Sequence, residues 1–363
     1  MAVPSKPPAN KFVASMRGLY NPIGFSKGYN FILWFIFSGA MMGFCLARFM
    51  YLNYDGVYCS PDASTMNHAA PGECWKYNTK DVYKIGIKMH LYTIIPAGFL
   101  VCFQFVPFIR YKAILFHRIN GYIVLLLSVA GTAGGLMIGR IAFGGGIEVQ
   151  TAVGLLAIMF LISLAISLYN VKMLQLEQHR AWMLRAWFYS GSIITTRLIT
   201  FITAQIISSK GTSTYYEAFQ CDELASFYNT TESLIAKYPE CRSTSAWVAV
   251  PANMNARSAE NIGAALRSNF GMALWLALAL HAIGVEVYLH LTPAEADRLR
   301  NVSYQRQLEA GFSNAGRAGL TTDRIGDAAI WTPANDKKDV AAVAPSVSND
   351  SVMSASRSAV TRV

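Results

Sequence analysis

The sequence predicts an all-α integral membrane protein: a bundle of six transmembrane helices, with both termini in the cytoplasm and two extracytoplasmic loops closed by disulfides. Three observations predict this fold class. Of the 363 residues, 53% are hydrophobic and 14% are charged, whereas soluble domains carry about a quarter charged residues. The hydrophobic residues form six runs that are each long enough to cross a bilayer, which takes about 20 helical residues. The basic residues flank these runs unevenly, as in multi-pass proteins.

The six expected spans divide the chain into membrane and aqueous parts. They cover residues 31–52, 85–108, 119–141, 148–170, 183–207 and 270–291. The first is a retained helix of the 31–291 domain and not a signal peptide, because 30 residues precede it and no small-residue cleavage site follows it. The remaining parts are an amino-terminal segment (1–30), two long connections (53–84 and 208–269) and a tail (292–363).

The orientation follows from Lys and Arg in the short flanks, which are retained on the cytoplasmic side. The amino-terminal segment has four basic residues and no acidic one, and the second-to-third and fourth-to-fifth connections are also basic. The residues concerned are Lys6, Lys11, Arg17, Lys27, Arg110, Lys112, Arg118, Lys172, Arg180 and Arg185. The two long connections are therefore expected to be extracytoplasmic.

The content of the two outer loops agrees with that side. Cys59 and Cys74 lie in the first loop, and Cys221 and Cys241 lie in the second. Four cysteines allow three pairings, of which Cys59–Cys74 and Cys221–Cys241 each close one loop locally. Asn229 begins an Asn-Thr-Thr glycosylation sequon. The protein is therefore expected to be a glycoprotein of the plasma membrane or a secretory-pathway membrane.

The lipid bilayer is the expected partner, and neither the net charge nor the composition of the carboxyl-terminal tail indicates a further one. A net charge of +10 would suggest nucleic acid in a soluble protein, but in a membrane protein it reflects the basic cytoplasmic flanks, and no nucleic acid is expected. From about residue 311 the tail is rich in Ala, Ser, Asn and Gly and is expected to be disordered. The oligomeric state is open.

Four histidines lie at or inside the expected bilayer, where a polar ring needs a partner. Imidazole is a common axial ligand of haem iron, and helix bundles present such ligands from facing helices. His117 and His179 both lie within a turn of the cytoplasmic boundary, so they are the candidate iron ligands of a haem b. His90 and His281 form a second pair, about 9 Å apart in depth. Structural roles, another metal and proton transfer remain alternatives.

Two arginines and a row of glycines could complete such a site. Arg197 lies near the middle of the fifth span and must face the bundle interior, where a haem propionate, a substrate carboxylate or backbone carbonyls could bind it. Arg185 is a second candidate for a propionate. Gly131, Gly135 and Gly139 leave a bare helical stripe, which either packs against another helix or accepts a planar ligand.

Several catalytic motifs are absent from the sequence. It has no phosphate-binding glycine loop, no dinucleotide fingerprint, no His-Glu-x-x-His element, no nucleophile elbow and no Asp-rich magnesium motif. Hydrolase, ATPase and prenyltransferase activities therefore lose support.

The histidine elements resemble those of the predicted membrane-protein family called domain of unknown function 2306. The resemblance covers roughly residues 85–205 and rests on Leu115-Phe116-His117-Arg118-Ile119-Asn120-Gly121-Tyr122 and on His179-Arg180-Ala181-Trp182-Met183-Leu184-Arg185. His90, Gln104-Phe105, Pro107 and Arg197 accompany these elements. The resemblance implies a multi-helix membrane fold and emphasises these positions, and it implies no settled activity.

A looser likeness is to cytochrome b561-type membrane proteins, in which six helices hold two haems between histidines. This chain departs from them because its four candidate ligands provide one well-matched pair. The likeness therefore implies one haem or none.

Three functions follow from these observations. The first is a b-type haem protein that transfers electrons across the membrane, to or from a quinone or a ferric chelate, and would be a membrane oxidoreductase if it is an enzyme. The second is a cofactor-free enzyme or binder for a small lipophilic molecule, in which the histidines and Arg197 act as acid, base or carboxylate clamp. The third is a transporter or an accessory structural protein.

Overall fold

A computed structural model describes residues 10–61, 68–209 and 214–333. The chain divides into two compact units. The first comprises Met1–Ala165 and Met183–Tyr288, and the second comprises Ile166–Trp182 and Leu289–Val363. Lys6 and the tail beyond residue 333 lie outside the described residues.

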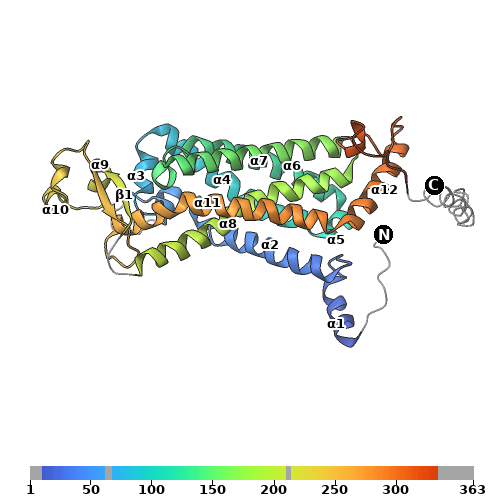
Figure 1. The fold of residues 1–363 in the computed structure, drawn as a ribbon, viewed down its shortest axis with the longest axis horizontal. Coiled ribbons are helices and arrows are strands. Elements are labelled where there is room, and N and C mark those ends of the chain that lie inside the picture. Colours follow the sequence, from blue (N-terminus) through green and yellow to red (C-terminus); the bar gives the residue numbers. More distant parts are fainter. Residues whose placement is uncertain (1–9, 62–67, 210–213, 334–363) are drawn as a thin grey trace, which may run out of the picture. The chain divides into compact units, whose positions relative to one another are not determined.

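Six helices of the described chain are long and apolar enough to cross a membrane, which confirms the predicted number and order of spans. They are α2 (Gly28–Leu46), α4 (Asp81–Gln104), α6 (Ile114–Ile138), α7 (Ile147–Lys172), α8 (Leu176–Ser208) and α11 (Ala259–His290) (Figure 1). Helices α8 and α11 begin well before the predicted spans, because hydropathy marks only the part inside hydrocarbon while the helical hydrogen bonds continue into the polar flank. The assignment of sides stays a prediction.

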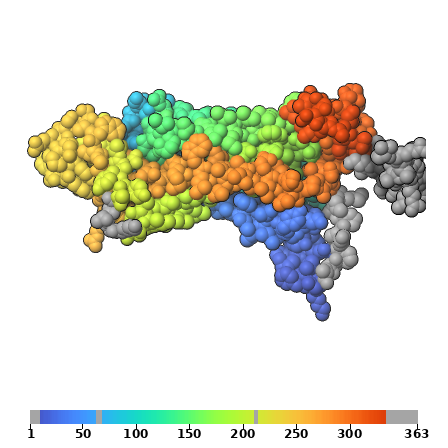
Figure 2. Space-filling model, viewed as in Figure 1, coloured from blue at the N-terminus to red at the C-terminus, as the bar shows by residue number. Residues whose placement is uncertain are grey.

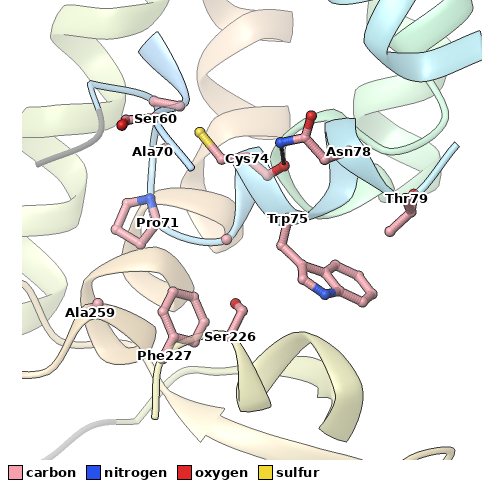
Figure 3. A pocket seen from close by; sticks show the side chains of 12 residues that line it. Ser60, Ala70, Pro71, Cys74, Trp75, Asn78, Thr79, Ser226, Phe227 and Ala259 are labelled. Carbon is pink, nitrogen blue, oxygen red and sulfur yellow. Dashed lines mark hydrogen bonds between the residues drawn. The ribbon is translucent and has the colours of Figure 1, made fainter. Parts of the chain in front are cut away.

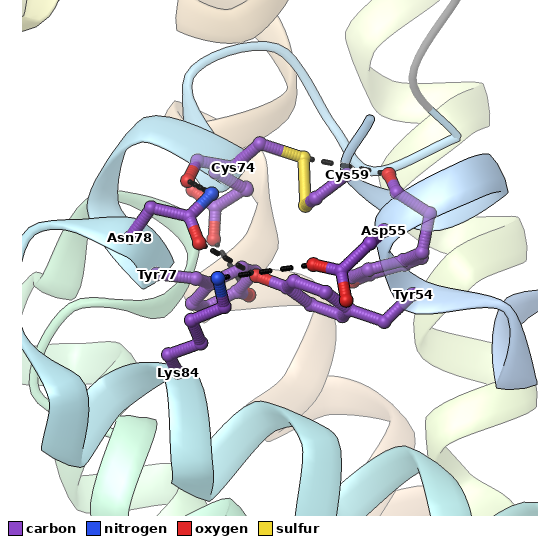
Figure 4. Close-up of a disulfide and its surroundings, with 9 residues drawn as sticks. Tyr54, Asp55, Cys59, Cys74, Tyr77, Asn78 and Lys84 are labelled. Atoms are coloured by element: carbon purple, nitrogen blue, oxygen red, sulfur yellow. Dashed lines mark hydrogen bonds and ion pairs between the residues drawn. A yellow bond between two sulfur atoms is a disulfide. The ribbon is translucent and has the colours of Figure 1, made fainter. Parts of the chain in front are cut away.

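The first outer loop is built from short helical turns held by a disulfide. These are η1 (Phe49–Leu52), η2 (Tyr54–Tyr58) and α3 (Glu73–Asn78). The Cys59–Cys74 bond forms as predicted, with Tyr54 and Tyr77 beside it (Figure 4). Tyr54 and Tyr77 are almost fully buried, so this loop has a packed core of its own.

The second outer loop adds a small two-stranded β-sheet to the expected all-α fold. Its elements are β1 (Tyr216–Gln220), α9 (Cys221–Ala225), α10 (Thr231–Lys237), η4 (Pro239–Arg242) and β2 (Trp247–Pro251). The strands are antiparallel, with Ala218 opposite Ala249. The predicted Cys221–Cys241 bond closes the loop over buried Phe219 and Val250. The loop forms one compact yellow mass in Figure 2, and Asn229 is exposed on it, although its glycosylation stays a prediction.

Helices α4 and α6 pack closely along the glycine row of α6 (Figure 1). A Cβ atom on Gly134 would lie 2.7 Å from the backbone oxygen of Gly86 and 2.7 Å from the backbone nitrogen of His90. A Cβ on Gly131 would lie 2.8 Å from Thr93 Oγ1. Gly131 of the row and the neighbouring Gly134 therefore serve helix packing, the first of the two expected roles, and leave no room for a planar ligand against α4.

The second unit joins the ends of α7 and α8 to α12 (Pro293–Glu309) and to the first part of the tail. Gln307 donates to Gln175 Oε1 at 3.0 Å and to the Met173 carbonyl at 2.8 Å. The sequence predicts disorder from about residue 311. The structure describes residues 311–333, and they include η5 (Thr322–Arg324). Within this segment Asp323 is buried and pairs with Arg300 at 2.6 Å. Burial alone would raise the pKa of Asp323, but hydrogen bonds from the Trp331 backbone, Thr321 and Arg300 outweigh it and lower the pKa to about 2.

The remaining helices of the described chain are short. They are α1 (Lys11–Tyr20), α5 (Pro107–Lys112) and η3 (Ala142–Gly145).

Because α4 and α6 approach closely at Gly134, we expect Gly134→Ala to destabilise the protein. The new methyl group meets backbone atoms that cannot rotate away, so we expect a loss of roughly 1–3 kcal/mol, typical of overpacking. The thermal unfolding midpoint of the detergent-purified protein should fall accordingly. Gly154→Ala on α7 is the matched control, because nothing lies within 4 Å of a Cβ there. Equal midpoints for the two variants would contradict this packing.

Candidate functional site

A buried ionic cluster ties the two outer loops to helix α11. Arg267 Nη2 lies 3.3 Å from Glu73 Oε1 and 2.5 Å from Glu223 Oε1. All three residues are nearly inaccessible, at 3%, 0% and 3% exposure. Lys76 Nζ lies 3.7 Å from Glu223, and the Tyr77 hydroxyl donates to Glu73 Oε2 at 2.9 Å. Buried charges need such partners, so the cluster fixes both loops over the ends of the helices.

The charges of this cluster change the pKa values of groups at its edge. Burial raises the pKa of Glu217 on β1, against the opposing charges of Arg267 and Lys76. Burial and then the nearby Arg267 lower the pKa of Lys76. In both groups burial disfavours the charged form.

The turn between α6 and α7 is strained and held by this cluster. Phe143 has φ 50° and ψ 49°, a left-handed conformation that costs a residue with a side chain about 1–2 kcal/mol. The Phe143 backbone N–H donates to Glu73 Oε2 at 2.9 Å, which offsets this cost. Gly144 follows with φ +88°, and a Cβ there would lie 3.1 Å from Glu217 Oε1. The cluster thereby sets the position of the Phe143 ring.

The Phe143 ring forms part of an aromatic box around Arg197 on α8. Phe143 and Phe270 are stacked with centroids 3.8 Å apart. The Arg197 guanidinium carbon lies 4.4 Å from the Phe143 centroid and 5.2 Å from the Phe270 centroid. Two cation–π contacts thus orient the charge. That Arg197 faces the bundle interior stays a prediction, because the residue is exposed.

Arg197 carries its charge without a salt bridge to the residues that the structure describes. It belongs to the exposed class of residues, although it lies about 16 Å below the outer end of α8 by helical rise. In the described ranges, no carboxylate lies within 4 Å of its guanidinium nitrogens. Its charge interacts with Glu73, Tyr58 and Tyr77 at longer range.

The two tyrosines report how close Arg197 lies to the first outer loop. Burial raises the pKa of Tyr58 far above its usual value, and the charge of Arg197 opposes that rise. The pKa of Tyr77 is also raised, first by burial and then by Glu73, and Arg197 opposes this too. The charge of Arg197 therefore acts on the phenols of the first outer loop. We call Arg197, Phe143, Phe270 and Tyr58 the Arg197 site.

A separate cavity of about 590 Å³ opens between the outer loops (Figure 3). Trp75, Phe227 and Pro71 line it together with small and polar side chains, and its one cysteine, Cys74, is in a disulfide. No titratable side chain of the described residues lines this cavity, so these residues offer it no acid, base or ion-pair partner.

The histidines that the sequence singles out differ in how many of their ring nitrogens form hydrogen bonds. His281 uses both ring nitrogens: Nδ1 lies 2.7 Å from the Phe188 carbonyl and Nε2 lies 2.8 Å from Thr195 Oγ1. With both ring nitrogens in hydrogen bonds, His281 has no nitrogen left to bind a haem iron. His90 uses Nδ1, which lies 2.7 Å from the Gly131 carbonyl.

The predicted His117–His179 pair lies on different units. His117 is in the first turn of α6, and His179 is on α8 in the second unit, where its Nδ1 lies 2.8 Å from Ser167 Oγ. Their joint binding of iron stays a prediction. Among the described residues, no group of three His, Cys, Asp or Glu side chains could hold a metal ion.

Arg185, the second candidate for a propionate, already has a carboxylate partner. Its Nε and Nη2 donate to the two oxygens of Glu286 at 2.6 and 2.9 Å. A bidentate pair of this kind fixes α8 against α11 and gives Arg185 a structural role.

Sequence reasoning missed the ionic cluster and Phe143. A partial signal exists, because Glu73 directly precedes Cys74 and Glu223 closely follows Cys221, so the disulfides bring acidic residues to the loop bases. Nothing in the sequence joins them to Arg267, which is 194 residues away from Glu73.

Removal of the shared cation tests the ionic cluster. Arg267→Met removes the cation that Glu73 and Glu223 share and leaves Lys76 near Glu223 alone, so we expect a loss of about 3–5 kcal/mol. The thermal unfolding midpoint should fall by several degrees, and proteolysis of the outer loops should accelerate. Arg257→Met, at an exposed position of the second outer loop, should behave like the wild type. A stable Arg267→Met protein would show that the cluster does not hold the loops.

Comparisons with known proteins agree with a membrane protein of unsettled activity. Residues 87–219 match the model of the family described as "Predicted membrane protein (DUF2306)". "Ava biosynthesis cluster protein G" from Aspergillus versicolor is 25% identical over 332 residues, which cover 77% of this chain and 94% of the relative. No solved structure matches. The chain is an integral multi-pass membrane protein, and the segment from α4 to β1 carries its similarity to the DUF2306 family.

Proposed function

We propose that the protein binds or converts a small lipophilic molecule with an anionic group, and that Arg197 holds this group inside the membrane domain. One observation carries the proposal: Arg197 is an exposed residue on a membrane-spanning helix and has no salt bridge within the described residues. Ionisable residues in membrane spans are costly and mark functional sites.

The aromatic box makes Arg197 suitable for this role. Phe143 and Phe270 contact the guanidinium through their rings, and a ring face uses none of the five N–H donors in a hydrogen bond. A carboxylate or phosphate oxygen can accept these donors in a bidentate pair. The surrounding apolar side chains would favour a lipophilic body on the same ligand.

The name of the fungal relative supports a small-molecule role. "Ava biosynthesis cluster protein G" is named for a biosynthesis cluster. This favours an enzyme or binder over a structural protein.

The test uses a fluorescent fatty acid, 11-(dansylamino)undecanoic acid, and its methyl ester with the protein in lipid nanodiscs. The acid should bind saturably above empty nanodiscs, and Arg197→Gln should weaken its binding at least about tenfold, which corresponds to about 1.4 kcal/mol. Arg257→Gln is the matched control and should bind like the wild type. Equal binding of acid and ester, or an unchanged affinity in Arg197→Gln, would overturn the proposal.

The second candidate is a b-type haem protein that transfers electrons to or from a quinone, with His117 and His179 as iron ligands. The contact of His179 Nδ1 with Ser167 Oγ favours it, because metal-ligating histidines are commonly oriented by a bond from their other ring nitrogen. When bound, a haem would supply one-electron chemistry, and these residues would fix its iron.

An oxidised-minus-reduced visible spectrum of the purified protein tests this candidate. Bis-histidine haem should give sharp difference bands that vanish in the His117→Ala, His179→Ala double variant and persist in His281→Ala. A flat spectrum after haem supplementation would exclude this function and leave the first proposal unaffected.

A further inference from the structure

The second unit contains a cavity of about 330 Å³ that none of the functions above uses. Its walls come from the end of α7 and from residues 312–324, which all belong to this unit. We call it the tail cavity. No carboxylate of the described residues lines it, and its polar side chains are those of Tyr169, Ser313, Asn314, Arg317 and Arg324.

The charges around the tail cavity are unbalanced. In the described part of the chain, Arg324 has no carboxylate within 4 Å, and Asp323 is the only one within 4 Å of Arg317, at 3.6 Å. Asp323 also pairs with Arg300 at 2.6 Å, and it is only 1% exposed. Three arginines thus share one buried carboxylate, which leaves two positive charges without a partner beside the cavity.

Both lining arginines keep hydrogen-bond donors that the described residues do not use. Arg324 donates through Nη1 alone, to the Tyr169 hydroxyl at 3.1 Å and to the Gly319 carbonyl at 2.8 Å. Arg317 donates through Nη2 to the Asp323 carbonyl at 2.9 Å. A guanidinium has five N–H donors, so each arginine has several left for an anionic ligand.

Three neutral side chains add further donors. Ser313 and Asn314 are exposed, and their side chains form no hydrogen bond with any residue that the structure describes. The Tyr169 oxygen accepts from Arg324, so its own hydrogen can still be donated. The tail cavity therefore combines two cations with neutral donors, a combination that favours an anion.

Buried polar side chains hold the loop of this cavity in shape. Asn170 Oδ1 accepts from the Leu320 N–H at 2.9 Å, and Gln307 Oε1 accepts from the Gly316 N–H at 2.6 Å. Both side chains are fully buried. Gly316 has φ +83°, and a Cβ there would lie 3.0 Å from the Trp331 ring, so the loop needs glycine at this position. A site ordered before its ligand arrives loses less entropy on binding.

The tail cavity lies at the end of a membrane-spanning helix. Tyr169 is in the last turn of α7, which ends at Lys172, and tyrosine is enriched at membrane–water interfaces. Met173 and Phe312 give the cavity an apolar wall. The sequence predicts that this end of α7 faces the cytoplasm, where basic pockets beside spanning helices bind phosphorylated headgroups.

We propose that the tail cavity binds a phosphomonoester, carried by a lipid headgroup or by a soluble molecule. A phosphomonoester has a charge of about −1.5 to −2 at neutral pH and three acceptor oxygens, which matches two unpaired arginines and the neutral donors. A carboxylate or a phosphodiester carries one negative charge and would leave one of these cations unneutralised. Guanidinium groups also bind phosphate oxygens in bidentate pairs.

The experiment is isothermal titration calorimetry of the full-length protein in phosphatidylcholine nanodiscs. The probes are dihexanoyl phosphatidic acid and glycerol 3-phosphate, which share the phosphomonoester, and dihexanoyl phosphatidylglycerol, an anionic phosphodiester. At least one phosphomonoester should bind above empty nanodiscs and at least about tenfold more tightly than the phosphodiester. Tighter binding of phosphatidic acid than of glycerol 3-phosphate would identify a lipid headgroup, and equal binding would identify a soluble ester. No binding of either phosphomonoester would overturn the proposal.

Two substitutions test the assigned residues. Arg324→Gln should weaken binding at least about tenfold, the effect of losing a hydrogen bond to a charged group. Ser313→Asp should weaken it to a similar degree, because it adds a negative charge and removes no hydrogen bond of the described structure. Arg306→Gln and Gln305→Asp, at exposed positions of α12 outside the cavity, are the matched controls and should bind like the wild type. An unchanged affinity in Arg324→Gln or in Ser313→Asp would contradict the assignment.

A measurement on the wild type avoids any effect of the substitutions on folding. Phenylglyoxal modifies guanidinium groups, and peptide mass spectrometry locates the product. The phosphomonoester that binds more tightly should slow the modification of Arg324 at least several times and leave that of Arg306 unchanged. Equal rates for Arg324 with and without the phosphomonoester would overturn the proposed site.

Discussion

The carboxylate of Glu73 receives hydrogen bonds from three separate elements, and the outer part of the molecule depends on this convergence. Arg267 donates from α11, the Tyr77 hydroxyl donates from α3, and the Phe143 backbone donates from the turn after α6. Because the group is fully buried, loss of any of these partners would leave polar atoms unsatisfied in an apolar environment. Glu73 therefore links the disulfide-closed first loop to the helices below it.

This link explains how a strained turn can shape a site. A left-handed Phe143 persists only where its surroundings hold it, and here its N–H is bound by Glu73 while its ring stacks on Phe270. The same ring then covers the guanidinium of Arg197. The ionic cluster of Glu73, Glu223 and Arg267 thus positions the Phe143 ring beside Arg197. Unlike the charges of that cluster, the charge of Arg197 is not paired with a carboxylate in the described structure.

Within the first unit, hydrogen bonds and ion pairs distinguish polar side chains with a structural role from those that are candidates for function. Arg185 is paired with Glu286, and His281 is bonded at both nitrogens. Among the described residues, Arg197 is exposed and has no such carboxylate partner, and His90 has a hydrogen bond at one ring nitrogen only. Both residues lie within the segment that matches the DUF2306 family, whereas Glu73 and Arg267 lie outside it. The chemistry and the framework that positions it thus come from different parts of the chain.

The sequence by itself determined the six spans and narrowed the disulfides to three pairings, of which the structure has the two local ones. Hydropathy over about 20 residues is a local property, and each disulfide joins cysteines only 15 or 20 positions apart. The sequence also pointed to Arg197 and to the four histidines, since polar groups in hydrocarbon are conspicuous. It could not tell which of them would be free to act, nor join Arg267 to a glutamate 194 residues away. Those choices depend on which helix faces meet. Only the tertiary structure decided them, because a hydrogen bond between distant segments is set by how they pack and not by the residues beside it.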